Sequence, residues 1–268
     1  MTQTESPMRE RILQSLIENG HEAWTSGEAL SGALGISRAA VSKHVMTLRE
    51  EGHIIESVPR RGYRLISRAD PWAGNDVREG LNTRVLGQAG WIWLKETGST
   101  NQVAALEAMQ GAQEGLVVVA RRQNEGRGSK GHRWFNLPGS LSFSVLTKPC
   151  LPPEKLEMLP YLAMEACAAA VEKSCGITLE KRLPNDLFLN NRKVVGILVE
   201  SMFHNTDIQW AVVGIGVNVN VPKVAIPPEL EGIASSLYAQ TGTAFSVTKL
   251  LRHLLEELEE RLPLRPCV

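Results

Sequence analysis

The segment Ile36-Ser-Arg-Ala-Ala-Val-Ser-Lys-His-Val-Met-Thr-Leu-Arg49 has the pattern of an amphipathic helix with one apolar stripe and one polar face. The hydroxyl of Ser37 can cap its start by accepting a hydrogen bond from a free N–H of the first turn. Val41, Val45 and Leu48 recur at helical spacing and form the expected buried stripe. The polar face is expected to face a groove of DNA. Its residues are Ser37, Arg38, Ala39, Ser42 and Lys43.

The residues around this segment complete a small DNA-binding unit. Helical periodicity predicts a first helix around Ile12 and Leu16. Thr25-Ser-Gly-Glu28 has the pattern of a capping box and predicts the start of a second helix, which ends at Gly35. Two helices joined by a tight turn that contains glycine form a helix-turn-helix. Two strand-like runs then flank Pro59-Arg60-Arg61-Gly62 and predict a β-hairpin wing.

Charge is divided unevenly along this unit. Residues 1–36 carry a net charge of −3 and residues 37–64 a net charge of +3, although the whole chain is formally neutral. Arg60 and Arg61 on the wing, with the cations of the third helix, are therefore placed to contact DNA phosphates. Winged helices also serve in protein contacts, so a unit that binds only protein is the alternative.

A polar segment with Pro71 and Gly74 follows and predicts a domain boundary. We therefore expect a winged helix-turn-helix domain at residues 1–66, a linker at residues 67–82 and a second domain at residues 83–268. Strand-like and helix-like runs alternate in the second domain, which indicates an α+β (mixed α/β) fold around a largely buried sheet. Strands are expected at Trp91–Leu94, Leu116–Ala120, Leu141–Leu146, Thr178–Arg182, Val194–Glu200 and Trp210–Val219, and helices at Asn101–Gln110, Lys155–Ser174 and Val247–Leu262.

A glycine-rich loop, Gly126-Arg-Gly-Ser-Lys-Gly131, lies between two of these strands. Its spacing matches the dinucleotide motif GxGxxG, but that motif needs a helix to open at the loop, and here a Pro-Gly pair and a strand follow. It is not a Walker loop either, because Gly-Lys-Ser/Thr is missing. Glycine N–H groups and the cations Arg127, Lys130 and Arg133 nevertheless suit a phosphate or adenylate. On these residues alone, an ordinary surface loop is the favoured interpretation.

Four further motifs stand in a fixed order around the loop, although each one alone could be a cap, a turn or a strand kink. Glu96-Thr-Gly-Ser-Thr-Asn101 precedes the loop, and Leu183-Pro-Asn-Asp186, Arg192-Lys-Val-Val-Gly-Ile-Leu-Val-Glu200 and Gly214-Ile-Gly-Val-Asn-Val-Asn220 follow it. In this order they resemble the catalytic domain of biotin protein ligases. The helix at residues 36–49 and the run Val58-Pro-Arg-Arg-Gly-Tyr63 closely resemble the DNA-binding domain of bifunctional biotin operon repressors. Together the two resemblances cover most of the chain.

The resemblance implies a role for each residue that falls on a family motif. Lys193, Arg127 and Asp186 would be catalytic, with Lys193 stabilising both the biotin carboxylate and the α-phosphate of ATP. Arg182, Asn185 and Asp186 would lie on the phosphate and magnesium side, and no fixed metal site is expected. Biotin and its adenylate would be bound by Ser99, Thr100, Asn101, Gln123, Gly126, Arg127, Gly128, Ser129, Trp134, Lys193, Gly196 and Asn218.

The same resemblance implies an ATP- and Mg²⁺-dependent biotin–[biotin carboxyl carrier protein] ligase for which biotin is both substrate and effector. The biotin carboxylate would attack ATP to give biotinoyl-adenylate, and a lysine of a carrier protein, such as that of acetyl-CoA carboxylase, would then attack the adenylate. Bound biotinoyl-adenylate would order the glycine loop and favour a homodimer that binds the palindromic operator of biotin genes and represses them. Unbiotinylated carrier would compete for the dimer surface.

Three features depart from the family pattern. Ser129 stands where the loop commonly has a second Arg, and Arg182-Leu183 replaces the usual Lys-Trp. The chain is also expected to lack the SH3-like C-terminal domain of most relatives. Ser129 predicts looser retention of the adenylate, unless Lys130 compensates. A non-ligating transcription regulator that binds biotin or biotinoyl-adenylate is therefore the alternative function, and a lipoate or octanoyl ligase is a third, which the winged helix disfavours.

The chain is expected to be cytoplasmic, with no membrane partner. No apolar run approaches the roughly 18 residues of a membrane span, and the start lacks a signal-peptide core. The four cysteines show no metal-ligand spacing. Cys167 and Cys175 lie in an apolar, helix-like stretch, so we expect them to be reduced core residues.

Overall fold

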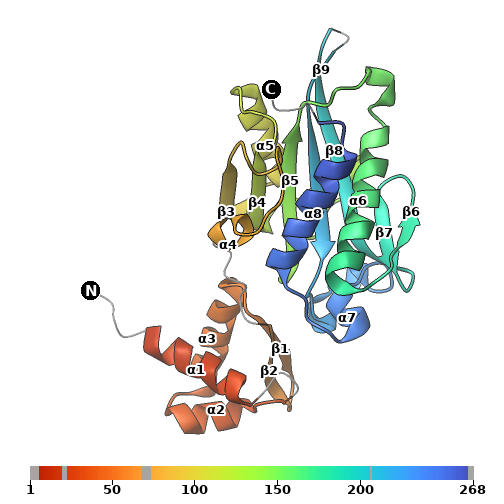
Figure 1. The fold of residues 1–268 in the computed structure, drawn as a ribbon. Helices are drawn as coiled ribbons and strands as arrows, with labels where there is room; N and C mark the ends of the chain where they lie inside the picture. Colours follow the sequence, from red (N-terminus) through yellow and green to blue (C-terminus); the bar gives the residue numbers. More distant parts are fainter. Residues whose placement is uncertain (1–5, 20–22, 68–73, 206, 265–268) are drawn as a thin grey trace.

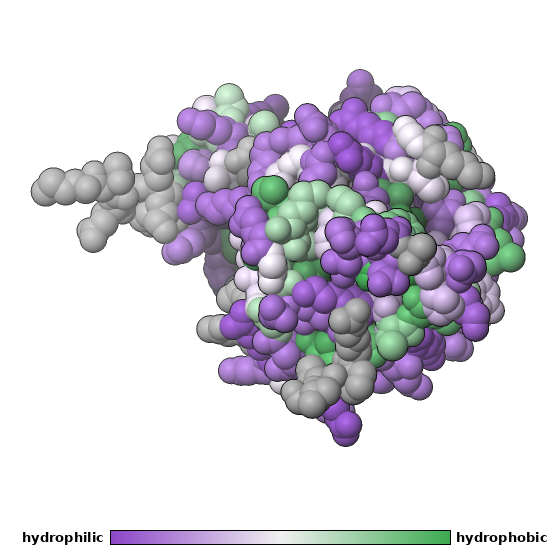
Figure 2. Space-filling view, turned by 90° about the horizontal axis from the view of Figure 1, so that it is seen from above, coloured by the Kyte–Doolittle hydropathy of each residue, from purple (hydrophilic) through white to green (hydrophobic). Residues whose placement is uncertain are grey.

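The computed structural model describes residues 6–19, 23–67, 74–205 and 207–264, and it shows a small N-terminal domain beside a larger domain built on one sheet (Figure 1). Among these residues no helix is long and apolar enough to cross a membrane. Seen from above, polar side chains cover most of the surface, and apolar areas are small (Figure 2).

The N-terminal domain is a winged helix-turn-helix, as predicted. Ser37 caps the third helix by accepting a hydrogen bond from the N–H of Ala40 at 3.1 Å, and Gly35 ends the second helix with a left-handed φ of 67°. Leu30, Val41 and other apolar residues of the three helices and the hairpin form a separate core. The elements are α1 (Ser6–Glu18), α2 (Gly27–Leu34), α3 (Arg38–Glu50), β1 (Ile54–Val58) and β2 (Gly62–Ser67).

The cap of α2 differs from the predicted capping box by one residue. Ser26, not Thr25, accepts the hydrogen bond from the N–H of Ala29. Thr25 instead pairs with Tyr63 through two backbone hydrogen bonds, N to O and O to N, of 2.8 and 2.9 Å. Gly62 makes this pairing possible, because a Cβ there would lie 2.1 Å from the carbonyl oxygen of Thr25. The wing is therefore anchored to the residue before the N-cap of α2.

The second domain has a seven-stranded sheet in the order β3-β4-β5-β9-β8-β7-β6. Only the β3–β4 pair is parallel, and the other neighbours are antiparallel. The strands are β3 (Trp91–Thr97), β4 (Val117–Gln123), β5 (Ser140–Thr147), β6 (Glu180–Arg182), β7 (Asp186–Leu189), β8 (Arg192–His204) and β9 (Asp207–Asn218).

Helices cover both faces of this sheet. Val117 and Val119 of β4 belong to the large core beneath α6 (Met158–Cys175) and α8 (Val247–Arg261), whereas Val118 packs with α5 (Thr100–Met109). Alternate residues of a strand point to opposite faces, so α5 lies on the face away from α6 and α8 (Figure 1). All eight residues of β5 are buried, as expected for a central strand covered on both sides. Two short helices, α4 (Gly74–Arg78) and α7 (Leu237–Thr241), complete the domain, with 3-10 turns η1 (Ser129–Gly131), η2 (Pro153–Lys155), η3 (Lys223–Ala225) and η4 (Pro228–Leu230).

Most predicted elements are confirmed, but α4, α7 and β7 were not foreseen. Part of the predicted linker, residues 68–73, lies outside the described residues, and residues 74–78 form α4 instead. Val77 of α4 is buried in the core of the second domain, and Arg252 of α8 donates hydrogen bonds to the carbonyl oxygens of Asp76 and Val77. Cys167 is a buried free thiol, as expected, and Cys175 is a partly buried one.

The two domains touch at the base of the wing. Glu56 and Arg64 form an ion pair of 2.6 Å, and the hydroxyl of Tyr238 in α7 lies 3.5 Å from both side chains. Ile54 and Ile66 pack with Tyr238 in a small apolar cluster. The wing strands therefore contact the second domain directly.

Candidate active site

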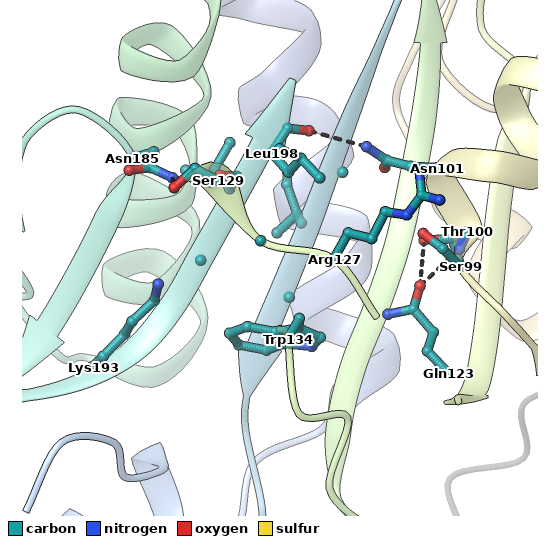
Figure 3. Close-up of a pocket in the computed structure, with 16 residues that line it drawn as sticks. Ser99, Thr100, Asn101, Gln123, Arg127, Ser129, Trp134, Asn185, Lys193 and Leu198 are labelled. Carbon is teal, nitrogen blue, oxygen red and sulfur yellow. Dashed lines mark hydrogen bonds between the residues drawn. The ribbon is translucent and has the colours of Figure 1, made fainter. Parts of the chain in front are cut away.

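A pocket lies over β8 and β9, between the start of α5 and the glycine loop (Figure 3). The empty space between its walls, which includes space open to solvent, is about 410 Å³. It is lined by Ser99, Thr100, Asn101, Gln123, Arg127, Gly128, Ser129, Trp134, Asn185, Lys193, Gly196, Ile197, Leu198, Gly214, Ile215 and Gly216.

One end of the pocket is polar but mostly uncharged. Ser99, Thr100 and Asn101 are buried at the N-terminus of α5. The Oε1 atom of Gln123 accepts hydrogen bonds from the backbone N–H of Thr100 at 2.7 Å and from its hydroxyl at 3.2 Å. These contacts use the Oε1 atom of Gln123 and leave its Nε2 donor group for a ligand. We call this region the head end.

A buried serine organises the head end. The hydroxyl of Ser144 lies 2.7 Å from the Thr100 hydroxyl and 2.6 Å from Oδ1 of Asn101. Gly214 leaves room for this arrangement, because a Cβ there would lie 2.0 Å from Oδ1 of Asn101. The Nδ2 group of Asn101 donates to the carbonyl oxygen of Leu198 at 3.3 Å. The orientation of Asn101 is therefore set from three elements, β5, β8 and β9.

The glycine loop folds back on itself as a hairpin. The N–H of Gly128 donates to the carbonyl oxygen of His132 at 2.7 Å, and the N–H of Trp134 donates to that of Gly126 at 2.8 Å. Only a 3-10 turn follows the second glycine, which confirms that the loop is not a dinucleotide-binding motif. The side chain of Lys130, the exception named for the looser retention predicted from Ser129, lies outside the described residues.

The indole ring of Trp134 packs on two glycines of the sheet, which form the floor of the pocket. Gly196 and Gly216 are neighbours across β8 and β9. A Cβ on Gly216 would lie 2.3 Å from the indole ring of Trp134, and one on Gly196 would lie 3.0 Å from it. The indole N–H donates to the hydroxyl of Ser142 at 3.3 Å. The middle of the pocket is therefore a flat aromatic and backbone surface.

The opposite end of the pocket is cationic, and we call it the cationic end. The Nζ atom of Lys193 lies 2.6 Å from Oδ1 of Asp186, and both side chains are partly buried. The Nδ2 group of Asn185 donates to the hydroxyl of Ser129 at 3.0 Å and to the carbonyl oxygen of Ile197 at 2.8 Å. Lys193 points into the pocket from β8 (Figure 3). This end can bind an anion.

Four predicted site residues do not line the pocket. Gly126 lies beneath the backbone of Trp134, and Asp186 lies behind Lys193. Asn218 is buried and accepts a hydrogen bond from the hydroxyl of Ser140 at 2.9 Å. Arg182 pairs with Glu180 at 2.8 Å and lies over the ring of Phe188, on the β6–β7 hairpin. The ten other predicted ligand-binding residues, and Asn185, are in the pocket lining.

Sequence reasoning gave no role to Ser142, Ser144 or Glu200. The two serines alternate with apolar residues in β5, together with Ser140. Such alternation in a buried strand indicates one polar face, and it could have pointed to the pocket. Glu200 gives no local signal, because its partners come from distant segments of the chain.

The predicted DNA-contact residues are exposed on the N-terminal domain. Ser37, Arg38, Ala39, Ser42 and Lys43 of α3 are all exposed, and so are Arg60 and Arg61 of the wing. Arg38 pairs with Glu28 of α2 at 2.6 Å, whereas Arg61 stacks over the ring of Trp24 at 4.9 Å.

Comparison with known proteins links both domains to characterised proteins. Residues 93–218 match the Biotin/lipoate A/B protein ligase family, and residues 9–64 match an HTH domain. The bifunctional ligase/repressor BirA of Bacillus subtilis is 35% identical over 257 residues, which is 96% of this chain and 78% of that protein. The Escherichia coli protein of the same name is 32% identical over 79% of this chain and 64% of its own length. A biotin protein ligase from Aquifex aeolicus, solved with biotin and ATP, superimposes with a TM-score of 0.54 and 32% identity over 64% of this chain and 69% of that one.

Proposed function

The chain belongs to the bifunctional biotin protein ligase and biotin operon repressor family, and from this premise we propose that it attaches biotin to a carrier protein and represses transcription. The enzyme activity is that of a biotin–[biotin carboxyl carrier protein] ligase. ATP and biotin are its small-molecule substrates, and biotin is also the effector.

The observation that carries this proposal is the chemical difference between the two ends of one pocket. The head end presents the hydroxyl and amide groups of Ser99, Thr100 and Gln123. The cationic end presents Lys193, on the other side of Trp134 (Figure 3). Biotin has a neutral ureido head, an apolar body and a carboxylate tail. Its three parts match the three parts of the pocket in order.

The proposed first step joins this carboxylate to ATP. A carboxylate oxygen of biotin attacks the α-phosphorus, the bond to the bridging oxygen breaks, and pyrophosphate leaves. Negative charge accumulates on phosphate oxygens, so a fixed cation such as Lys193 stabilises the transition state. A carrier lysine amine then attacks the mixed anhydride, an amide bond forms, and AMP leaves. Neither step needs a protein nucleophile.

Mg²⁺ is proposed to accompany ATP in this step. Within the described residues, no group of three or more His, Cys, Asp or Glu side chains is suited to hold a metal ion. The ion would therefore be held mainly by ATP phosphates and water, with Asp186 as a protein oxygen ligand beside Lys193. It would offset phosphate charge.

The repressor role is proposed for the exposed face of α3 and the wing. Arg38 and Lys43 would meet phosphates and base edges of the operator of biotin genes, and Arg60 and Arg61 would contact the adjacent backbone. A homodimer formed with bound biotinoyl-adenylate would present two such faces to a palindromic operator, and unbiotinylated carrier would compete with dimerisation. The cytoplasm stays the predicted location.

Ser129 favours a second candidate, a biotin-responsive regulator that does not ligate. Its hydroxyl accepts a hydrogen bond from Asn185 at a position where the family loop commonly carries an arginine. Leu183, where the family has an aromatic residue, is 72% exposed.

A biotinylation assay separates the two candidates. The purified chain is incubated with biotin, Mg-ATP and an acetyl-CoA carboxylase carrier domain, and pyrophosphate release is followed beside a streptavidin blot. Labelled carrier supports the ligase. Pyrophosphate release without labelled carrier, or neither signal with retained biotin binding, supports the regulator. Failure to bind biotin at all would refute both.

A further inference from the structure

The carboxylate of Glu200 joins two parts of the head end that are far apart in sequence. Its Oε2 atom accepts a hydrogen bond from Nδ2 of Asn101 at 2.8 Å, and its Oε1 atom lies 3.8 Å from Nη1 of Arg127. Glu200 stands on β8, Asn101 at the start of α5 and Arg127 in the glycine loop. One carboxylate therefore ties the loop to the fixed wall of the pocket.

The negative charge of Glu200 affects which head group the pocket can bind, because it lies beside Arg127. The other groups of the head end are hydroxyls and amides, so Arg127 is the cation there among the residues that line the pocket. A ureido group is neutral and cannot offset a guanidinium charge. Glu200 offsets it instead, so the head end is close to neutral when the ligand enters. At the opposite end Lys193 lines the pocket, and its partner Asp186, 2.6 Å away, lies outside the lining.

We propose that Glu200 is a positioning and specificity-determining residue that holds Arg127 against the head end and keeps this end neutral for an uncharged, hydrogen-bonding head group. The inference rests on the proposed function, because the head group is taken to be the ureido ring of biotin. Glu200 acts through Arg127 and does not react.

The test variant is Glu200→Gln, which keeps an oxygen acceptor for Asn101 and removes the charge that holds Arg127. We expect the KM for biotin in pyrophosphate release to rise about two- to fivefold, as fits an exposed ion pair. The KM for ATP and kcat should stay within about twofold. Glu200→Asp, which keeps the charge, should raise the KM for biotin less than Glu200→Gln does.

Two comparisons show whether the effect passes through Arg127. In an Arg127→Ala background, Glu200→Gln should add no further rise in KM, because its partner is gone. Sulfate should compete with biotin more strongly in Glu200→Gln than in the wild type, because the guanidinium is then uncompensated. Glu165→Gln is the matched control, since it breaks a 2.6 Å ion pair with Lys181 outside the pocket.

A measurement without ligands keeps the inference testable if the enzyme proves inactive. Trypsin should cut after Arg127 faster in unliganded Glu200→Gln than in the wild type, while thermal unfolding stays similar. Wild-type protein that releases no pyrophosphate with biotin would overturn the ligase assignment alone. Unchanged KM for biotin in active Glu200→Gln, or unchanged trypsin cleavage, would overturn the role of Glu200.

Discussion

Replacing Lys193 with Met removes the cation at the cationic end and keeps a side chain of similar length. Lys193 is the pocket cation nearest to where the ligand carboxylate and the α-phosphate would meet, and its Nζ pairs with Asp186 at 2.6 Å. Two unit charges about 4 Å apart attract by about 4 kcal/mol at an effective dielectric constant of about 20. The side chain is 28% exposed, so solvent screening reduces this figure somewhat.

A loss of about 3–4 kcal/mol corresponds to a fall of about 10²- to 10³-fold in kcat for pyrophosphate release. The variant also leaves the Asp186 carboxylate without its partner beside incoming phosphates. The KM for ATP should therefore rise as well. Adding Asp186→Asn should not restore kcat, because the stabilising cation is still missing and the proposed oxygen ligand of Mg²⁺ is then lost as well.

The assay is initial-rate pyrophosphate release at varied biotin and Mg-ATP, with thermal unfolding to confirm the fold. Lys193→Met protein that keeps more than about a tenth of the wild-type kcat would refute the assignment of Lys193. A double variant with restored kcat would show that Lys193 only neutralises Asp186.

Three further predictions concern the floor, the helices and the DNA face. Gly216→Ala should either destabilise the protein by about 1–3 kcal/mol or displace Trp134 and weaken biotin binding by a similar free energy. Denaturant titration would detect the loss of stability, and calorimetry would detect the weaker binding of biotin. Burial lowers the pKa of His253, which contacts Ser174, below its ordinary value near 6.5. The neutral ring therefore contributes stability that is fully present above pH 6.5 and is lost as the pH falls through the lowered pKa. His253→Gln should flatten the fall in unfolding free energy below pH 6.5. Lys43→Ala should weaken operator and non-operator DNA alike and reduce the slope of log K against log salt concentration by about 0.9, and an unchanged slope in binding titrations would argue against a phosphate contact.

Local signals accounted for the N-terminal domain and most of the sheet. Ser37 and Gly35 specify the ends of helices through their own backbone neighbours, so they could be read from short segments. The helix cap is at Ser26, one residue after the predicted Thr25, because Thr25 is held by Tyr63. This contact joins residues far apart in the sequence, so no local pattern predicts it. Strand β7 was hidden for a similar reason, since only its pairing with β6 and β8 makes Asp186–Leu189 a strand.

Family motifs predicted most of the pocket lining, and the exceptions follow from side-chain direction. Arg182 lies in the same motif as Asn185, but its guanidinium turns to Glu180 and Phe188 on its own hairpin. Ser144 and Glu200 are brought to Asn101 by the order of the strands. Sequence spacing carries no information about that order.

The indole of Trp134 resting on Gly196 and Gly216 also limits how the gene can vary. Any single-base change that replaces a glycine codon by another amino-acid codon adds at least a Cβ atom, and at Gly216 that atom would lie inside contact distance of the indole. Only changes of the third base of these codons, which keep glycine, leave the ring in place. A substitution at Gly216 therefore requires the indole of Trp134 to move or to be replaced at the same time.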